Sequence, residues 1–189
     1  MARGETLTRF AAEHGIPIIS IEEIKQYQSS LSPLPRVATY PVHEFEWVKV
    51  QLRNAEWELA TYPSLKHREQ VVMRYCAEEK TPMVRIHSEC FTGDVVHSQR
   101  CDCGQQLDAS IAAIEEYGCG YILYIRDHEG RGIGLTEKLK AYILQNEGLD
   151  TVDANLQLGH QVDARDWSEA IAILKNLKLT AIKLLTSNP

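Results

Sequence analysis

Residues 85–104 read RIHSECFTGDVVHSQRCDCG and place three thiols, Cys90, Cys101 and Cys103, in one short run. Thiolate is a preferred ligand of Zn2+, and a catalytic zinc site has three protein ligands with water in the fourth position. Zinc lowers the pKa of such a water toward neutrality and so makes hydroxide available at neutral pH. Three clustered cysteines with no evident fourth ligand therefore predict a catalytic zinc site.

The neighbouring histidines leave a second interpretation open. His87 or His97 could serve as a fourth protein ligand, and four protein ligands would make the zinc structural rather than catalytic. The remaining cysteines, Cys76 and Cys119, are expected to be small apolar residues of the interior, because free cysteine is often buried for packing alone.

Composition and charge limit the classes of protein to which this chain can belong. The chain has 189 residues, 44% of them hydrophobic, which is enough for one domain with a sizeable core and an appendage. No apolar run is long enough to span a membrane, and no signal-peptide region is evident. An odd number of cysteines, 5, favours a reducing cytoplasm. The net charge of −6 argues against a nucleic-acid partner, whereas a few clustered Arg and Lys residues still suffice for a phosphorylated ligand.

The chain divides at a segment rich in Ser and Pro. Residues 1–35 are predicted to be a helical appendage and linker, and residues 36–189 the main domain. The appendage is expected to contain short helices at 6–14 and 21–27, followed by a linker at 29–35.

The main domain begins with strands and continues with alternating helices and strands. Its fold class is predicted to be α+β (mixed α/β), with a β-rich N-terminal part followed by helices and strands around the zinc site. Strands are expected at 45–52, 57–62, 70–75, 121–125 and 181–185. Helices are expected at 105–117, 136–147 and 166–177.

Each expected helix carries an apolar stripe. In the first, the stripe is Leu107, Ile111 and Ile114. The second is expected to be capped by Thr136 and to carry Leu139 and Ile143. The third is expected to turn three apolar side chains inward, those of Trp167, Ile171 and Leu174.

Residues 126–135, RDHEGRGIGL, follow directly on the strand at 121–125. Glycines let the backbone approach a ligand closely, and the N-terminus of a following helix favours an anion. Arg131 could supply a bidentate phosphate contact. A tight turn with solvated charges explains the same residues, because the run has neither the P-loop lysine nor the spacing of a dinucleotide fingerprint.

Four of these segments together resemble a known family. The runs at 85–94, 100–104, 128–135 and 150–159 resemble, in order, the signature of GTP cyclohydrolase II, which performs the first committed step of riboflavin biosynthesis. The resemblance extends from about residue 84 to 189 and is loose over 37–83. Residues 1–28 instead resemble the C-terminal tail of 3,4-dihydroxy-2-butanone 4-phosphate synthase, without the acidic active-site segments of that enzyme, so no synthase activity is predicted.

The resemblance implies a substrate, cofactors and site residues. It implies GTP as substrate, Zn2+ held by Cys90, Cys101 and Cys103, Mg2+ with the triphosphate, formate and pyrophosphate as products, and a cytoplasmic homodimer. The residues that it implies in GTP binding are Arg85, Ile86, His87, Ser88, Glu89, Gln106, Glu129, Gly130, Arg131, Thr151 and Thr186. Glu129 would read the N–H edge of guanine.

The resemblance also implies three catalytic residues. Tyr142 would assist hydrolysis beside the guanine ring, Asp163 would be the acid/base, and Arg165 the nucleophile at the α-phosphate. Arginine is a poor nucleophile because its pKa is very high, so clamping of phosphate is the safer role for Arg165. From the residues alone, Asp163 and Arg165 could equally be a surface pair, and Tyr142 a boundary residue of its helix.

The family continues beyond the position of Thr186 into a segment with a GTP-binding lysine, which this sequence does not contain. Loss of one charge-assisted phosphate contact costs about 1.5–3 kcal/mol, or about 10- to 100-fold in affinity. The expectation is zinc binding with weak GTP binding and slow or no turnover. Two rival functions stay open: a non-catalytic paralogue that binds a guanine nucleotide, and a GTP hydrolase that retains the formyl group.

Overall fold

The structure is a computed structural model that describes residues 12–14, 42–64 and 68–186. The chain divides into two compact units, Met1–Tyr40 and Pro41–Pro189. In the first unit a helical turn at 12–14 is described, whereas the expected helix at 21–27 and the linker at 29–35 lie outside the described residues. Within the described segments, no helix is long and apolar enough to cross a bilayer.

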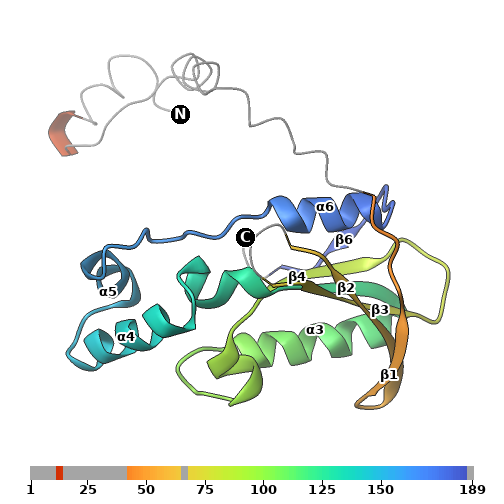
Figure 1. Cartoon of the computed structure of the whole chain (residues 1–189), viewed down its shortest axis with the longest axis horizontal. Helices are drawn as coiled ribbons and strands as arrows, with labels where there is room; N and C mark the ends of the chain where they lie inside the picture. Colours follow the sequence, from red (N-terminus) through yellow and green to blue (C-terminus); the bar gives the residue numbers. More distant parts are fainter. Residues whose placement is uncertain (1–11, 15–41, 65–67, 187–189) are drawn as a thin grey trace. The chain divides into compact units, whose positions relative to one another are not determined.

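A six-stranded mixed sheet forms the centre of the second unit (Figure 1). In the sheet, β1, β2, β3 and β5 are antiparallel neighbours, and β4 runs parallel to both β5 and β6. The order across the sheet is β1-β2-β3-β5-β4-β6. The strands are β1 (Val48–Leu52), β2 (Ala55–Tyr62), β3 (Gln70–Cys76), β4 (Met83–Ser88), β5 (Cys119–Ile125) and β6 (Lys183–Leu184).

Helices cover both faces of this sheet. Figure 1 shows α3 on one face and α6 on the other, with α4 and α5 beyond the ends of the strands. The helical elements are η1 (Phe91–Val95), α3 (Cys103–Tyr117), η2 (Arg126–Gly132), α4 (Leu135–Asn146), α5 (Thr151–Gln157) and α6 (Ser168–Asn176). The mixed α/β class predicted from the sequence is confirmed.

The order of the expected elements in the main domain agrees with the structure. The five expected strands correspond to β1, β2, β3, β5 and β6, and the three expected helices to α3, α4 and α6. Three further elements, the strand β4, the helix α5 and the helical turn η1, are not among those expected from the sequence. The expected cap at Thr136 was wrong, because α4 begins after Gly134, whose φ of 84° is in the left-handed region, and it has no side-chain cap.

A hydrophobic core lies between α3 and the antiparallel strands. Trp57, Ile111, Ile114 and Ile122 form a buried cluster, and Leu107 packs against it. The apolar stripe expected on α3 is therefore confirmed. The indole N–H of Trp57 donates to Glu115 Oε1 at 2.8 Å, so the one polar atom of this large side chain is paired.

The stripes expected on the other two helices were wrong. On α4, Leu139 and Ile143 are 47% and 60% exposed, and the helix buries Lys138 and Ala141 instead. Ile171 of α6 is 47% exposed, and Trp167, the residue before the helix, is 40% exposed, whereas Leu174 is half-buried. That helix buries a different set of residues, namely Glu169, Ala170, Ala172 and Ile173.

The two cysteines outside the cluster differ from each other. Cys119 is buried at the start of β5, as expected. Cys76 is exposed at the end of β3, where it pairs in register with Cys119, so its expected burial was wrong. The last residue of a strand that leads into a surface turn has fewer neighbours than the strand's interior, and this explains the exposure of Cys76.

One matched pair of substitutions tests these assignments. Ile114→Ala removes a side chain that is 0% exposed and should destabilise the fold by about 2–5 kcal/mol. Ile143→Ala removes the same atoms from a side chain that is 60% exposed and should cost less than about 0.5 kcal/mol. Urea unfolding followed by far-UV circular dichroism measures both. Equal costs would contradict the assignment of Ile143 to the surface of α4.

The topology gathers polar residues at one edge of the sheet. Because β4 and β5 are parallel, their carboxyl ends, Ser88 and Ile125, lie side by side. The amide of Glu89 donates to the carbonyl of Ile125 at 3.0 Å and continues this pairing by one residue. In sheets with parallel strands, ligands bind outside the carboxyl ends of those strands. The turn η1 follows β4 at this edge and η2 follows β5.

Candidate functional site

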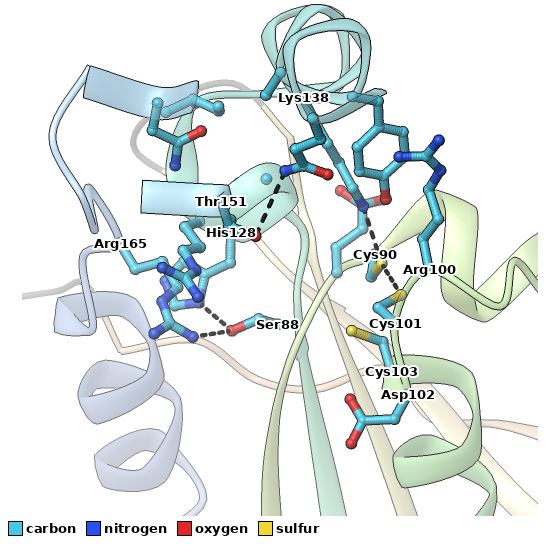
Figure 2. A pocket seen from close by; sticks show the side chains of 18 residues that line it. Ser88, Cys90, Arg100, Cys101, Asp102, Cys103, His128, Lys138, Thr151 and Arg165 are labelled. Carbon is cyan, nitrogen blue, oxygen red and sulfur yellow. Dashed lines mark hydrogen bonds between the residues drawn. The ribbon is translucent and has the colours of Figure 1, made fainter. Parts of the chain in front are cut away.

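The three cysteines of residues 85–104 converge between β4 and α3 (Figure 2). Cys90 follows β4, and Cys103 is the first residue of α3. The sulfur atoms of Cys90, Cys101 and Cys103 all lie within 4.8 Å of one another, and Cys90 Sγ is 3.5 Å from Cys101 Sγ. Three sulfur atoms at this separation form a donor set that could hold a metal ion.

A single π-helical turn, η1, makes this convergence possible. The amide of Val96 donates to the carbonyl of Phe91 at 3.3 Å, which is the five-residue spacing of a π-helix. A Cβ atom at Gly93 would lie 2.9 Å from Cys101 Sγ and 3.2 Å from Cys90 Sγ. Because real Cβ atoms do not approach sulfur so closely, the glycine leaves the thiols the space that they occupy.

Gly93→Ala is therefore expected to impair metal binding without changing any ligand. The added methyl group must displace Cys101 Sγ, so metal affinity should fall by at least about 10-fold, the lower end of the effect of disturbing a site's surroundings. The unsubstituted protein is the reference, and circular dichroism establishes that the variant is folded. Competition with a chromophoric chelator measures the metal affinity of both proteins. Unchanged affinity in Gly93→Ala would show that the site accommodates the methyl group.

The surroundings of the cluster favour one thiolate, at Cys90. Its pKa is lowered to about 4 by the hydrogen bond from Cys103 and then by those from Lys138 and Thr92, against the opposing effect of burial. Lys138 Nζ donates to Cys90 Sγ at 2.9 Å. The pKa of Cys103 is raised by its hydrogen bond to Cys90 and by burial. The cluster thus offers an anionic sulfur at neutral pH.

The two histidines are not part of this group. Among the described residues, the set of potential ligands that meet in space comprises the three cysteines and neither His87 nor His97. His87 Nε2 lies 3.2 Å from both carboxylate oxygens of Asp94, so this nitrogen is directed away from ligation. The interpretation of the cluster as a four-ligand site with a histidine is therefore not supported by the geometry.

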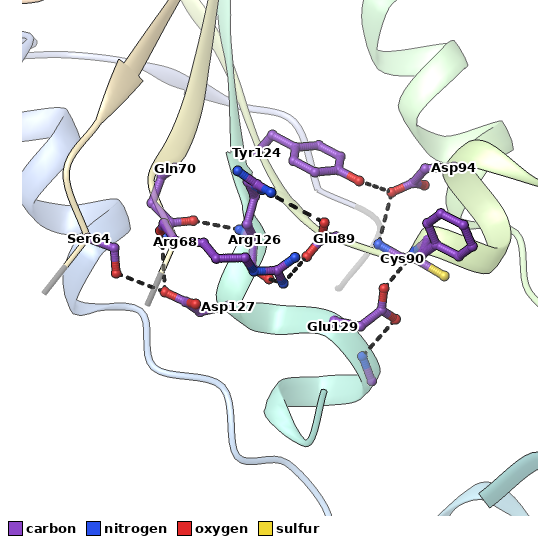
Figure 3. Close-up of polar contacts among 12 residues, drawn as sticks. Ser64, Arg68, Gln70, Glu89, Cys90, Asp94, Tyr124, Arg126, Asp127 and Glu129 are labelled. Atoms are coloured by element: carbon purple, nitrogen blue, oxygen red, sulfur yellow. Dashed lines mark hydrogen bonds and ion pairs between the residues drawn. The ribbon is translucent and has the colours of Figure 1, made fainter. Parts of the chain in front are cut away.

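Hydrogen bonds of Asp94 connect the thiol cluster to β5. Its Oδ2 accepts hydrogen bonds from the amide of Cys90 at 2.9 Å and from the hydroxyl of Tyr124 at 2.8 Å (Figure 3). Burial raises the pKa of Asp94, but its contacts with His87, Tyr124 and Cys90 outweigh burial and hold the pKa below its ordinary value. The carboxylate is therefore ionised at neutral pH and fixes the backbone of Cys90 relative to β5.

A cavity of about 330 Å³ opens beside the thiols. Figure 2 shows the cysteines and Lys138 on one side of it, with Ser88 and Arg165 on the other. The expected site residues that line it are Ser88, Glu89, Cys90, Cys101, Cys103, Gly130, Arg131, Tyr142, Thr151 and Arg165.

A second cavity, of about 390 Å³, meets the first. Three residues line both cavities, namely Ser88, Cys103 and Arg165. The further expected residues that line the second cavity are Arg85, Ile86, His87, Gln106 and Thr186. The fold therefore brings nearly all of the expected site residues, which span Arg85 to Thr186 in sequence, into two adjoining cavities.

Glu129 lines neither cavity. Its side chain is buried, and its carboxylate is occupied by protein donors (Figure 3). Oε2 accepts from the amide of Phe91 at 2.7 Å, while Oε1 accepts from the amide of Gly130 at 3.1 Å and from Lys138 Nζ at 2.7 Å. In this arrangement the carboxylate is directed at the turn η1 and at α4 rather than at a ligand.

Asp163 is outside both cavities but holds a residue that lines both. Arg165 Nε donates to Asp163 Oδ1 at 2.9 Å and Arg165 Nη2 to Oδ2 at 2.5 Å. The hydrogen bonds from Arg165 lower the pKa of Asp163 to about 2. Since that pKa is depressed, the ion pair is complete at neutral pH and is lost only as the pH falls toward about 2. Arg165 Nη1 also donates to Ser88 Oγ at 3.4 Å.

Three further expected residues, Arg85, Gln106 and Glu89, are held by specific contacts. Arg85 Nη2 donates to Gln106 Oε1 at 2.7 Å, and burial lowers the pKa of Arg85. Glu89 Oε2 accepts from Arg68 Nη2 at 2.6 Å, as Figure 3 shows, and burial raises the pKa of Glu89. Arg68 was not among the residues singled out in the sequence.

Tyr142 projects from α4 into the first cavity. Its hydroxyl lies 3.0 Å from Thr92 Oγ1, and the guanidinium of Arg100 lies 4.7 Å from the centre of its ring. Sequence reasoning missed Thr92, Arg100 and Lys138 as parts of the site. Lys138 and Tyr142 are four residues apart on one helix, so they share a face, and this spacing was the available signal.

Comparisons with known proteins agree with this geometry. A family model described as GTP cyclohydrolase II matches residues 44–189. Proteins named riboflavin biosynthesis protein RibBA are 38% identical in Chlamydia trachomatis, 39% in Chlamydia muridarum and 42% in Mycobacterium tuberculosis H37Rv. Each match covers 100% of this chain and 44% of the relative, so the chain spans less than half the length of these curated relatives. The chain belongs to the GTP cyclohydrolase II family of hydrolases.

Proposed function

We propose that this chain hydrolyses GTP, opening the imidazole ring and releasing formate and pyrophosphate. The product would be 2,5-diamino-6-ribosylamino-4(3H)-pyrimidinone 5′-phosphate, and the reaction the first step of riboflavin biosynthesis. The observation that carries the proposal is the junction of two cavities at Cys103, Ser88 and Arg165, where a thiol cluster and a guanidinium face the same space. Family membership supports the same assignment.

Zinc is the metal that best fits the cluster. Soft thiolate ligands select Zn2+ over Mg2+ or Ca2+, and three sulfur ligands leave one position of a tetrahedral ion open. Cys90, Cys101 and Cys103 would hold the ion, and Gly93 leaves room for it. A zinc ion bound in this way would supply hydroxide at neutral pH for attack on C8 of the guanine.

The two cavities suggest how the nucleotide lies. In the anti conformation of a purine nucleotide, C8 and the 5′-phosphate are on the same side of the sugar. The junction therefore serves both reacting centres, with C8 near Cys103 and the α-phosphate near Arg165. Arg85 in the second cavity and Arg131 in the first are further cations for the triphosphate, and Mg2+ would screen the remaining charge.

The contacts of the expected catalytic residues suggest their roles. Tyr142 is oriented by Thr92, so that its hydroxyl can hold or transfer a proton beside the opening ring. Asp163 is engaged by Arg165 through two oxygens and has a pKa lowered to about 2, which favours orienting Arg165 over acid/base catalysis. Arg165 in turn is placed to stabilise negative charge as pyrophosphate leaves. These roles, together with the homodimer and the cytoplasmic location, stay predictions.

The test is a product assay. The zinc-loaded protein is incubated with GTP and Mg2+, and formate, pyrophosphate and the pyrimidine are quantified together. Stoichiometric release of all three supports the proposal. A product heavier by one carbonyl group would instead identify the formyl-retaining hydrolase, and GTP binding without any product would identify the non-catalytic paralogue. Absence of turnover in a zinc-loaded version that extends to the full length of the relatives would refute the cyclohydrolase activity.

A further inference from the structure

A buried ammonium group lies between the thiol cluster and the acidic residue of η2. Lys138 is 9% exposed, and its Nζ donates to Cys90 Sγ at 2.9 Å and to Glu129 Oε1 at 2.7 Å. Burial of a lysine costs several kcal/mol unless the charge is paired and hydrogen-bonded. Lys140, two residues further along α4, is exposed and pairs with Glu137 on the surface. Helix formation alone therefore does not require the burial of Lys138.

Glu129, the ion-pair partner of Lys138, contacts the backbone beside Cys90. Glu129 Oε2 accepts from the amide of Phe91, the residue that follows Cys90, at 2.7 Å. Lys138 thus contacts the sulfur of Cys90, and Glu129 contacts the next peptide group. Lys138 and Glu129 also form an ion pair with each other. The two residues therefore fix both the sulfur of Cys90 and the peptide group that follows it.

We propose that Lys138 and Glu129 are positioning residues of the thiol cluster, which hold Cys90 for metal binding. Three thiolates carry one more negative charge than a divalent ion neutralises, and the ammonium of Lys138 compensates that charge within a buried site. The carboxylate of Glu129 keeps the ammonium charged and in place. The inference rests on the proposed metal site but not on turnover of GTP.

The experiment compares the same substitution at two positions of one helix. Lys138→Met removes the charge beside Cys90, whereas Lys140→Met removes an exposed charge and is the matched control. Zn2+ affinity is measured in the 189-residue protein by competition with a chromophoric chelator. Lys138→Met is expected to weaken Zn2+ binding by about 10- to 100-fold, as loss of an outer contact of a metal ligand does, and Lys140→Met to leave it unchanged.

The absorption spectrum of the Co2+-loaded protein supplies a readout that a merely structural role does not move. Because the thiolate-to-metal bands depend on hydrogen bonding to sulfur, they should shift in Lys138→Met relative to the unsubstituted protein and to Lys140→Met. Circular dichroism establishes that each variant is folded. Wild-type affinity together with an unshifted spectrum in a folded Lys138→Met protein would overturn the proposal.

Glu129→Gln is the second variant, and it tests the positioning role even if Lys138→Met does not fold. The amide keeps an acceptor for the backbone but loses the charge that holds Lys138. A positioning role predicts weaker Zn2+ binding and a combined effect with Lys138→Met smaller than the sum of the two, because the residues act as one unit. A role in reading guanine predicts unchanged Zn2+ affinity and weaker GTP binding, and that outcome would overturn the inference.

The Zn2+ and Co2+ measurements use the metal alone, so their result is separate from that of the product assay. A protein without GTP turnover whose Lys138→Met variant binds Zn2+ weakly would refute the proposed activity and leave the positioning role intact. A protein with turnover whose Lys138→Met variant binds Zn2+ normally would refute only the positioning role.

Discussion

Replacement of Cys103 by serine is expected to abolish both zinc binding and formate release. A serine hydroxyl does not ionise at neutral pH and is a harder ligand than thiolate, so the donor set falls from three sulfur atoms to two. Loss of an outer contact of a metal ligand already costs about 10- to 100-fold in affinity, so loss of a direct ligand should cost more than about 100-fold. Ring opening should fall to background, because the hydroxide that the bound zinc would supply is lost with the metal.

The control variants distinguish loss of zinc binding from a general effect of replacing a cysteine. Cys76→Ser makes the same change at an exposed cysteine outside the cluster and should leave zinc content and formate release as they were. Zinc is quantified after dialysis against a weak chelator, and formate by a coupled dehydrogenase assay. Cys90→Ser and Cys101→Ser should reproduce the effect of Cys103→Ser. Retention of one zinc ion per chain in any of the three would exclude that cysteine from the metal site.

The convergence of the thiols was predictable because it is a local feature. Cys90 and Cys103 are separated by one short turn and the start of one helix, so few arrangements of the intervening chain are available. Arg165 and Thr186 belong to the same cavities but lie far along the chain from Cys90. No periodicity within a single element reports such a contact. The resemblance to a family was needed to associate them.

Reasoning from hydrophobicity failed at the elements that form the site. On α4 it selected Leu139 and Ile143, whereas the helix turns Lys138 and Ala141 inward, toward the first cavity. A lysine is an unlikely interior residue until its partners are known, and Glu129 and Cys90 are brought to it only by tertiary structure. The inward face of this helix is therefore set by the electrostatics of the site.

Polar contacts also explain the error on α6 and the strand that was missed. On α6, Glu169 is buried because Gln70 Nε2 donates to its carboxylate at 2.5 Å. The strand β4 reads MVRIHS, and its polar residues interrupt the apolar pattern because they line the second cavity. The short helix α5 did leave a signal, since Asp150 Oδ1 accepts from the amide of Val152 at 2.7 Å as an N-cap.

The second large effect is expected at Arg165, where turnover should fall by about 10³- to 10⁵-fold in Arg165→Ala, the range found for a cation that stabilises phosphoryl transfer. The loss should appear in kcat more than in KM, because charge on the departing pyrophosphate develops in the transition state. Zinc content should not change, since the side-chain hydrogen bonds of Arg165 are to Ser88 and Asp163 and not to a cysteine. Arg53→Ala, which removes a surface arginine paired with Asp108, is the matched control.

Further variants distinguish an electrostatic role of Arg165 from a covalent one. Arg165→Lys retains a cation but cannot form the two-pronged contact with Asp163, so an electrostatic role predicts partial activity and no adduct. Asp163→Asn keeps Arg165 but weakens the contact that orients its guanidinium. Because a displacement of about 1 Å costs about 100-fold in rate, turnover of this variant should fall by about that factor. A nucleophilic role predicts instead that label from [α-32P]GTP remains on the unsubstituted protein after acid-free denaturation. Detection of that phosphoramidate, and its absence in Arg165→Ala, would contradict the electrostatic role, because that role forms no bond between Arg165 and phosphorus.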